Sequence, residues 1–489
     1  MSLTVGLDIA RKSLAASAEQ TSVVSRNITR AGESLATRKT AHLVTALGGG
    51  VQVISITRAT NTALFNNLLN STSDSASQAA ISAALDQMSS IFGDTDLEAS
   101  PSALIGKLGD ALTQLAAAPN DAVRAQAVVT AADTLAKTLN DATNQISELR
   151  ARADLDMSSA VDRINSELQK FDEVNRAIII GTRTGSDVTD LQDARDRILA
   201  TLSEDIGVRT IDRADGDMAI FTDSGVPLFE KSARTVTFDR TLFLSTSDTG
   251  LPVYVDGVPI TGQGMGMQST SGRLTGLAQI RDDLTATFQS QLDEVARGLI
   301  TLFSETDQSA VPALPDAPGL FTWSGAPGIP AGGTIEVGLA GQIFINPAAD
   351  RRVGGNPFLV RDGGINGASY VYNATGAAGY SDRVDGLIDA LQTPIAFDAN
   401  AQLGTSKALG DFASQSIGWL QQVRSIAQAE ADYRSTLLER TSEALSKETG
   451  VNLDDEMTKL LDLERSYQAS SKIVSVIDSM FASFMAALR

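Results

Sequence analysis

The run GVNLDDEMTKLLDLERSYQASSKIVSVIDSMF (residues 450–481) decides how this chain is interpreted. Apolar residues recur in it every three or four positions from Leu453 onward, which is the spacing of an amphipathic helix. Asn452 is the predicted N-cap, and Asp454 and Glu456 lie in the first turn, where the helix dipole favours anions. The sequence therefore predicts a C-terminal helix with one apolar face that other residues must cover.

The first thirty residues carry a matching pattern. Steps of four and three residues alternate along Leu3, Leu7, Ala10, Leu14, Ser17, Thr21, Val24 and Ile28. This spacing is typical of a coiled-coil seam. Because helical sequence stands first and last in the chain, with proline-rich sequence between, we expect the two terminal helices to pair.

Pairing alone does not cover both helices. The outer sides of the pair still carry the apolar residues Ile9, Val23, Leu461, Val476, Met480 and Met485. Either a third helix of the same chain covers these side chains, or other copies of the chain do so. Periodicity leaves both alternatives open.

Composition describes an ordinary globular chain that is too long for one core. Of the 489 residues, 43% are apolar and 20% are charged, and we expect two to four domains. The chain contains no uninterrupted run of eighteen apolar residues, so no membrane-spanning helix is predicted. The formal net charge of −20 argues against a nucleic-acid partner, because phosphates require a basic patch. The two ends are weakly complementary, with a basic excess in residues 1–60 and an acidic excess after Gly450.

Cysteine is absent and histidine occurs once, at position 42. Disulfides, zinc fingers and thiol chemistry are therefore excluded. The N-terminal region contains Arg11 and Lys12 and no apolar segment, so we expect no cleaved secretory signal peptide.

The distribution of proline divides the chain. Eleven of the 13 prolines fall within residues 206–270 and 309–401, and proline is expelled from helix interiors. Residues 121–180 hold the three- and four-residue spacing without proline and predict one helix about 90 Å long. In the first proline-rich window, Asp256 and Gly257 separate two β-prone runs and predict a hairpin.

We therefore predict an elongated multi-domain rod, mainly α, with inserted β-rich domains and paired terminal coiled-coil helices. The expected terminal domain combines residues 1–32 and 452–489, and the expected helical body combines 33–205, 271–308 and 402–451. The expected outer domains are 206–270, rich in β structure, and 309–401, rich in glycine, proline and β structure, and the two could form one domain.

No catalytic constellation is apparent, and we expect neither an enzyme nor a bound metal or cofactor. His42 has no second histidine or cysteine to work with. Asp187, Asp190, Asp193 and Asp196 recur every three residues, but Arg183, Arg195 and Arg197 lie close enough to neutralise a cation site. A polysaccharide-acting site within 309–401 would need clustered acids, and the candidates for it are Asp350, Asp362 and Asp382.

Several segments resemble the flagellar axial proteins, and within that group the hook-associated protein 1 family. Gly450 to Glu456, followed by Tyr467, Gln468 and Ala469, resembles its C-terminal motif. Further similar positions are Leu191, Asp193, Arg195 and Asp196, the turn at Pro119, Asn120 and Asp121, and Ser271, Gly272, Arg273 and Leu274. After Ile28 the family usually has a Pro-Gly turn, which is missing here, where Ser34, Leu35 and Ala36 precede Thr37.

The resemblance implies a structural component that joins the flagellar hook to the filament. It implies a ring of identical subunits, contact with the hook protein and with a second junction protein, and an export chaperone on the C-terminal helix. It also implies export through the flagellar type III apparatus to an extracellular position. The assembly interface that we predict on this basis comprises Leu7, Leu14, Val24, Ile28, Leu460, Leu463, Tyr467, Val474, Ile477 and Phe481.

Two other classes remain as alternatives. A coiled-coil effector or translocator of a virulence type III system would share the export route, but would be expected to contact a membrane, for which no segment is sufficiently apolar. A hook-type axial protein would share the terminal helices but would continue into β structure, whereas residues 61–205 are predicted to be mainly helical. A flagellin would lack the segment around Leu191–Asp196 and the Asn-Leu-Asp-Asp run before the last helix.

Overall fold

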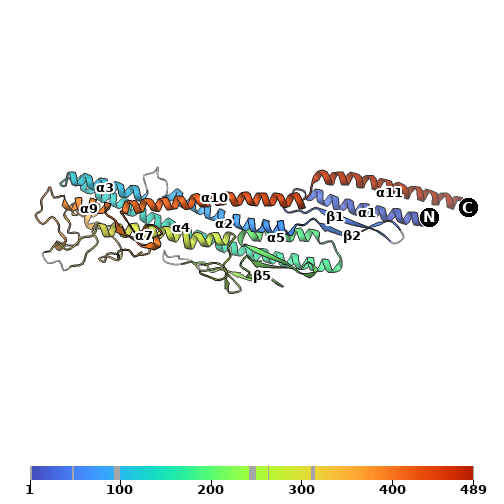
Figure 1. The fold of residues 1–489 in the computed structure, drawn as a ribbon, viewed down its shortest axis with the longest axis horizontal. Coiled ribbons are helices and arrows are strands. Elements are labelled where there is room, and N and C mark those ends of the chain that lie inside the picture. Colours follow the sequence, from blue (N-terminus) through green and yellow to red (C-terminus); the bar gives the residue numbers. More distant parts are fainter. Residues whose placement is uncertain are drawn as a thin grey trace.

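The computed structural model describes residues 3–46, 49–92, 100–241, 249–262, 264–309 and 314–487. Most of the helices run along one long axis, and both chain termini lie at the same end of the molecule (Figure 1). The predicted fold class, a mainly α elongated rod with paired terminal helices, is confirmed. Within the described residues, no helix combines the length and the apolar character needed to cross a membrane.

The terminal end consists of two antiparallel helices, α1 (Leu3–Arg30) and α11 (Leu453–Ala487). Gly6, near the start of α1, lies against Ile477, near the end of α11. Asn452 is the N-cap of α11, because its Oδ1 accepts the backbone N–H of Asp454 at 2.9 Å. The predicted helix and its predicted cap are therefore both confirmed.

A β-hairpin follows α1. Strand β1 (Lys39–Thr45) pairs antiparallel with β2 (Val51–Arg58), and the register shifts between His42 and Leu43. The hairpin packs along α1 on the side away from α11 (Figure 1). The sequence had assigned residues 33–60 to the helical body.

The turns around this hairpin explain two features of the sequence. Gly49 has a φ of 92°, and a side chain there would come within 2.9 Å of Ile9 Cδ1, so glycine lets the hairpin approach α1 closely. Leu35, where the expected Pro-Gly turn is missing, still turns the chain with a φ of 59°. The sharp connection after α1 therefore forms without proline.

The body is a bundle of long helices. Its members are α2 (Thr62–Phe92), α3 (Pro101–Ala117), α4 (Ala122–Thr184), α5 (Thr189–Asp205), α6 (Arg273–Gln279), α7 (Thr285–Leu302) and α10 (Leu409–Thr449), with a π turn at Ile280–Leu284 between α6 and α7. Helix α4 has 63 residues, so it is about 95 Å long. Asp121 caps it by accepting the backbone N–H of Val123 at 2.8 Å, as the predicted turn at this position requires.

The core of the body follows the apolar row of α4. Leu139, Ile164 and Phe171 are completely buried, and helices α3, α5, α6 and α7 contact α4 along its length. Helix α10 lies against α2 and completes the bundle. The three- and four-residue spacing of this region thus reflects a face that the chain covers itself.

The first proline-rich window lies beside the middle of the rod (Figure 1). It forms two small sheets, β3 (Val208–Asp212), β4 (Met218–Thr222) and β5 (Pro227–Phe229), then β6 (Val236–Thr237), β7 (Tyr254–Val255) and β8 (Val258–Pro259). The predicted hairpin is confirmed, with positive φ at Asp256 (47°) and Gly257 (80°). After Arg234 the described residues form only the two-residue strand β6, and residues 242–248 lie outside the described part.

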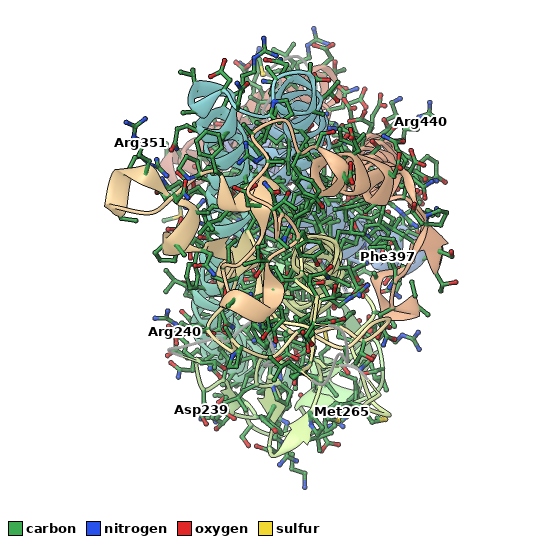
Figure 2. All side chains as sticks on the ribbon, turned by 90° about the vertical axis from the view of Figure 1, so that its left-hand side faces the viewer. Asp239, Arg240, Met265, Arg351, Phe397 and Arg440 are labelled. Carbon is green, nitrogen blue, oxygen red and sulfur yellow. The ribbon has the colours of Figure 1, made fainter. Side chains whose placement is uncertain are left out.

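The second window forms the end of the rod opposite the termini. Its described strands β9 (Phe321–Thr322), β10 (Phe344–Ile345) and β11 (Ile395–Ala396) have two residues each, and β11 pairs with β12 (Ser406–Lys407). Two helices, α8 (Leu359–Asp362) and α9 (Asp382–Gln392), and several 3-10 turns account for the remaining regular structure. Figure 2 faces this end and shows Arg351 projecting from its rim.

The expectation of a β-rich domain over 309–401 was wrong in its secondary structure. The run TIEVGL (residues 334–339) is not a strand. Eight prolines lie in this window, and each removes a backbone donor that a sheet needs. Turns and short helices result. The domain boundaries proposed for the chain stay a prediction.

Candidate assembly interface

The predicted seam lies between α1 and α11, and it is only partly covered. Val24 and Ile477 are buried, at 7% and 9% exposure, and Tyr467 is 44% exposed. The remaining predicted residues are half-buried, namely Leu7, Leu14, Ile28, Leu460, Leu463, Val474 and Phe481. The two helices therefore shield each other along the seam without forming a closed core.

A second apolar row on α11 is exposed. Ile473, Val476, Met480 and Phe484 are between 51% and 58% exposed, and their spacing of three and four places them on one side of the helix. We call these four residues the lateral stripe. A shallow groove of about 550 Å³ runs over part of it, lined by Val476, Ser479, Met480, Ser483 and Phe484. The sequence indicated Val476 and Met480 as outer residues, but not the continuous stripe.

The terminal helices are attached to the body through a buried charged joint. Its centre is Asp193 on α5, whose side chain is fully buried. Asp193 accepts hydrogen bonds from Thr37 Oγ1 at 2.6 Å, from Lys39 Nζ at 2.8 Å and from Arg58 Nη1 at 3.2 Å. These three donors come from the connection after α1 and from both hairpin strands, so one carboxylate holds the hairpin to α5.

The rest of the acidic row extends this joint on both sides. Arg26 pairs with Asp187 at 2.9 Å, and Arg30 pairs with Asp190 at 2.5 Å. Lys39 also reaches Asp190 at 2.7 Å, and Arg58 reaches Asp196 at 2.5 Å. The four aspartates at three-residue spacing therefore bind basic side chains of α1 and of the hairpin.

The sequence assigned the wrong partners to this row. Arg183 pairs with Asp215 at 2.9 Å. Arg195 donates to Asn175 and to the Gly216 carbonyl, while Arg197 approaches Glu33 at 3.9 Å. These three arginines bind other groups, and the basic side chains that pair with Asp193 come from residues more than 130 positions away.

Burial and charge act against each other in the joint. At Asp190, burial favours the neutral acid, but the bond to Lys39 and the charges of Lys39, Arg30 and Arg26 bring its pKa below the usual value. The pKa of Asp187 is likewise lowered, against burial, by bonds from Thr189 and Arg26. Burial prevails at Asp196 and raises its pKa, although Arg58 opposes the shift.

A further set of hydrogen bonds connects α11 to the same joint. Glu456 is completely buried and accepts from Asn27 Nδ2 at 2.9 Å and from Lys459 Nζ at 2.6 Å. Asn27 also bonds the backbone of Lys39, donating to its carbonyl and accepting its N–H. Both terminal helices and the hairpin are thus held together where they meet the body, and this joint was not predicted.

The other candidate residues have structural partners. The ring of His42 lies exposed on the hairpin, 2.8 Å from Thr57 Oγ1. Asp350 pairs with Arg352 at 2.9 Å and Asp362 with Arg361 at 2.7 Å, while Asp382 begins α9. In the described part of the chain, no group of three histidine or acidic side chains has the arrangement of a metal site.

A helical rod with paired termini, a charged joint and an uncovered apolar stripe has the architecture of a self-assembling structural protein. The family model described as "Flagellar hook-associated protein FlgK helical domain" matches residues 85–319. A second model, "Flagellar basal body rod FlgEFG protein C-terminal", matches residues 444–488. These matches confirm the resemblance to the flagellar hook-associated protein 1 family that the sequence motifs predicted.

Individual proteins similar to this chain also carry flagellar names. The chain is 22% identical over 516 aligned positions to "Flagellar hook-associated protein 1" of Bacillus subtilis (strain 168), covering 97% of this chain and 96% of that protein. Among solved structures, it is similar to the flagellar hook junction protein FlgK from Burkholderia pseudomallei, with 23% identity and a TM-score of 0.43. That match covers 53% of this chain and 47% of the other.

Proposed function

We propose that this chain is a structural subunit of the bacterial flagellum that joins the hook to the filament. The observation that carries the proposal is the uncovered lateral stripe on a terminal helix pair that a charged joint holds to the body. The similarity to flagellar hook-associated proteins supports the flagellar setting. The role is mechanical, and the proposal includes no catalytic step.

The exposed stripe gives assembly its driving force. Each of its four side chains is more than half exposed, and burying such a side chain stabilises a structure by about 1.5–3 kcal/mol when it goes from exposed to fully covered. Since half of each surface is already covered, contact with another molecule gains on the order of several kcal/mol per subunit before the entropy of association is subtracted. An isolated molecule leaves this free energy unrealised.

In the proposed arrangement, the terminal domain (residues 1–32 and 452–489) lies in the inner tube of the axial structure. The body and the two proline-rich windows face outward. The joint transmits bending or twisting between the two parts, because its ion pairs connect α1 and the hairpin directly to α5. Partners would be copies of this chain, the hook protein and a second junction protein.

The proposal also includes the route by which the chain leaves the cell. The chain would leave the cell unfolded through the flagellar type III apparatus, with a chaperone protecting its C-terminal helix before assembly. The exposed apolar residues of α11 are the kind of surface that needs such protection. The absence of cysteine suits this route, because no disulfide can form before export.

The experiment that tests the proposal places a charge in the seam. Val474→Asp and Leu460→Asp are produced in a strain that lacks its own copy of the gene, and swimming and filament attachment are scored. We expect exported protein with a folded body, but hooks without filaments. Ile180→Asp is the matched control, because Ile180 is 65% exposed on α4 in the body and should tolerate the charge. Normal filaments in both seam variants would contradict the assembly role.

A further inference from the structure

Strand β2 has an unpaired outer edge. On the opposite strand, Lys39 turns its backbone N–H and C=O away from β2 and toward the side chain of Asn27. Bonded and non-bonded pairs alternate in an antiparallel ladder, so its partner Arg58, and Ile56 two residues earlier, turn their backbone groups away from β1. Among the described residues, neither Ile56 nor Arg58 makes a backbone–backbone hydrogen bond outside the hairpin. These groups are therefore available to another strand.

The free edge borders a cleft of about 910 Å³, a volume typical of ligand sites. Its walls are β2, α5 with the turn before it, and the adjoining ends of α2 and α10. All residues from 53 to 58 line it. Successive side chains of a strand point to opposite faces of the sheet, so an unbroken run indicates that the cleft follows the edge of β2 and not one of its faces.

The α5 wall of the cleft contributes Arg195, which is only 4% exposed. Its Nη1 donates to Asn175 Oδ1 at 3.1 Å and to the Gly216 carbonyl at 2.7 Å. Its Nε is buried without a hydrogen-bond partner, and no described residue forms an ion pair with this guanidinium. Arg195 is therefore a buried cation whose charge the described part of the chain leaves unpaired.

This state is unfavourable for a guanidinium. Another buried arginine, Arg281, pairs with Asp154 at 2.7 Å. At Arg195, burial disfavours the charged form and lowers the pKa, although the charge of Asp196 opposes the shift. A buried charge without a partner is costly, and a carboxylate is the partner that a guanidinium binds most strongly. The cleft therefore favours a ligand with a carboxylate.

The shape of the cleft favours a peptide over a small carboxylate. A small ion would use neither the free backbone groups of β2 nor the side chain of Ile54, which lines the cleft and is 58% exposed. An extended peptide uses both. The hairpin register is regular from Ser55 to Arg58, so the strand that fits beside this edge is short.

We propose that the cleft binds an extended segment of a partner protein, which adds to β2 as a third strand and places an acidic side chain against Arg195. Main-chain hydrogen bonds to Ile56 and Arg58 hold the segment, and the carboxylate gives it specificity. A third strand also stabilises the hairpin, since two strands alone are marginal. The inference goes beyond the junction role and does not depend on it, because the whole site lies within one chain.

Selection from a peptide library tests the site. Phage that display random linear heptapeptides are selected on the purified full chain, and the enriched peptides are synthesised with a fluorescent label. Fluorescence anisotropy measures the affinity of each peptide and of a neutral copy in which glutamine or asparagine replaces the acid. Hydrogen–deuterium exchange, followed by mass spectrometry, then locates the bound peptide on the chain.

We expect the enriched peptides to contain aspartate or glutamate and to slow exchange in β2. The neutral copy should bind at least tenfold more weakly. Arg195→Gln should remove this preference for the acid, because no guanidinium is left to bind it.

A proline substitution tests the strand edge separately. Ile56→Pro removes the outward N–H and leaves the hairpin ladder intact, so it should weaken the acidic peptide and its neutral copy alike. The matched control is Val51→Pro, which removes an outward N–H at a residue that does not line the cleft and should leave both affinities unchanged. Unaltered exchange in β1 without peptide shows that each variant keeps its hairpin.

Several outcomes overturn the inference. They are a library that yields no binding peptide, a neutral copy that binds as tightly as the acidic peptide, an affinity that Arg195→Gln leaves unchanged, and slowed exchange away from β2. Displacement of the acidic peptide by an equimolar amount of acetate would also overturn it, and would identify a small carboxylate as the ligand. None of these results bears on the junction role, which fails on normal filaments in both seam variants.

Discussion

Helices α4 and α11 have the same three- and four-residue spacing but opposite surroundings. In α4 the spaced side chains, such as Leu139 and Phe171, are completely buried by the body. In α11 the buried residues among those described are Glu456, Ser470 and Ile477, and a complete apolar stripe is exposed. The comparison teaches that periodicity predicts a helix with an apolar face, but not whether the same chain supplies its cover.

The joint between these two regions differs from both. Its buried groups are charged, with Asp193 and Lys39 almost completely covered. Buried ion pairs contribute little net stability compared with apolar packing, because desolvation offsets the attraction between the charges. We infer that the joint serves mainly to hold the terminal pair in one orientation relative to the body.

The largest expected effect is a loss of stability in the buried core around α4. Phe171 packs edge-to-face against Phe229 with ring centroids 4.9 Å apart. Phe171→Ala should lower the free energy of unfolding by about 3–5 kcal/mol, because it removes a large buried side chain and leaves a cavity. Urea unfolding followed by circular dichroism measures this difference.

The matched variant is Phe484→Ala in the lateral stripe. Its side chain is 58% exposed, so the isolated molecule should lose no more than about 0.5 kcal/mol. Equal losses from the two substitutions would mean that the stripe is covered within one molecule, and the contrast between α4 and α11 would no longer hold.

The next effect concerns the joint. Asp193→Ala leaves Lys39 and Arg58 without their central carboxylate, and breaking a buried pair on one side costs about 3 kcal/mol or more. We expect faster proteolytic cleavage in the hairpin and α1, while the core of the body resists as before. Fragments identified by mass spectrometry measure this.

Asp187→Ala provides the matched control at the rim of the joint. Its side chain is 25% exposed, and an exposed ion pair contributes no more than about 1 kcal/mol. Cleavage should therefore change little. If proteolysis cleaves the hairpin and α1 at the same rate in both variants, Asp193 does not hold the joint together more strongly than Asp187 does.

The smallest expected effect is a pH dependence at the far end of the body. Asp293 on α7 accepts the backbone N–H groups of Gly338 and Ala340, both at 2.8 Å. Burial outweighs these bonds and raises its pKa from 3.8 to about 6. The folded state therefore binds the proton more tightly than the unfolded state, so this contribution to stability is complete below about pH 4 and is lost by about pH 6.

The size of that loss is about 2–3 kcal/mol, since each pKa unit corresponds to 1.36 kcal/mol. Asp293→Asn should flatten this part of the stability profile, measured by urea unfolding between pH 4 and pH 7. Asp187 and Asp190 in the joint should behave in the opposite way, because their pKa values are lowered and their contributions disappear only as the pH falls below about 4. An unchanged profile in the variant would refute the assignment to Asp293.

The features that the sequence predicted correctly depend on neighbouring residues. Asn452 caps α11 by accepting a hydrogen bond from the backbone N–H two residues later. Asp256 and Gly257 form a hairpin because both adopt positive φ. Capping, turn chemistry and helical spacing act over a few residues, so one sequence is enough to locate them.

Interpretations that failed depended on distant residues or on competing local preferences. The hairpin of β1 and β2 was assigned to the helical body, because its strands pair only when Lys39 and Arg58 come together in the fold. The second proline-rich window lacks the free N–H groups for longer strands. The acidic row was correctly found, but its partners were sought in Arg183, Arg195 and Arg197, which lie near it in the chain. Its real partners arrive only when α1 and the hairpin fold against α5.

By itself, the sequence determined the long helices, the N-cap of α11, the pairing of the two ends and the resemblance to hook-associated proteins. These follow from short-range interactions and from the order of elements along the chain. Only the tertiary structure decided which charges meet in the joint and which apolar side chains remain uncovered on α11. Both depend on how far-separated segments lie in space, because attraction between charges and burial of apolar surface are set by distance in the fold and not by distance along the chain.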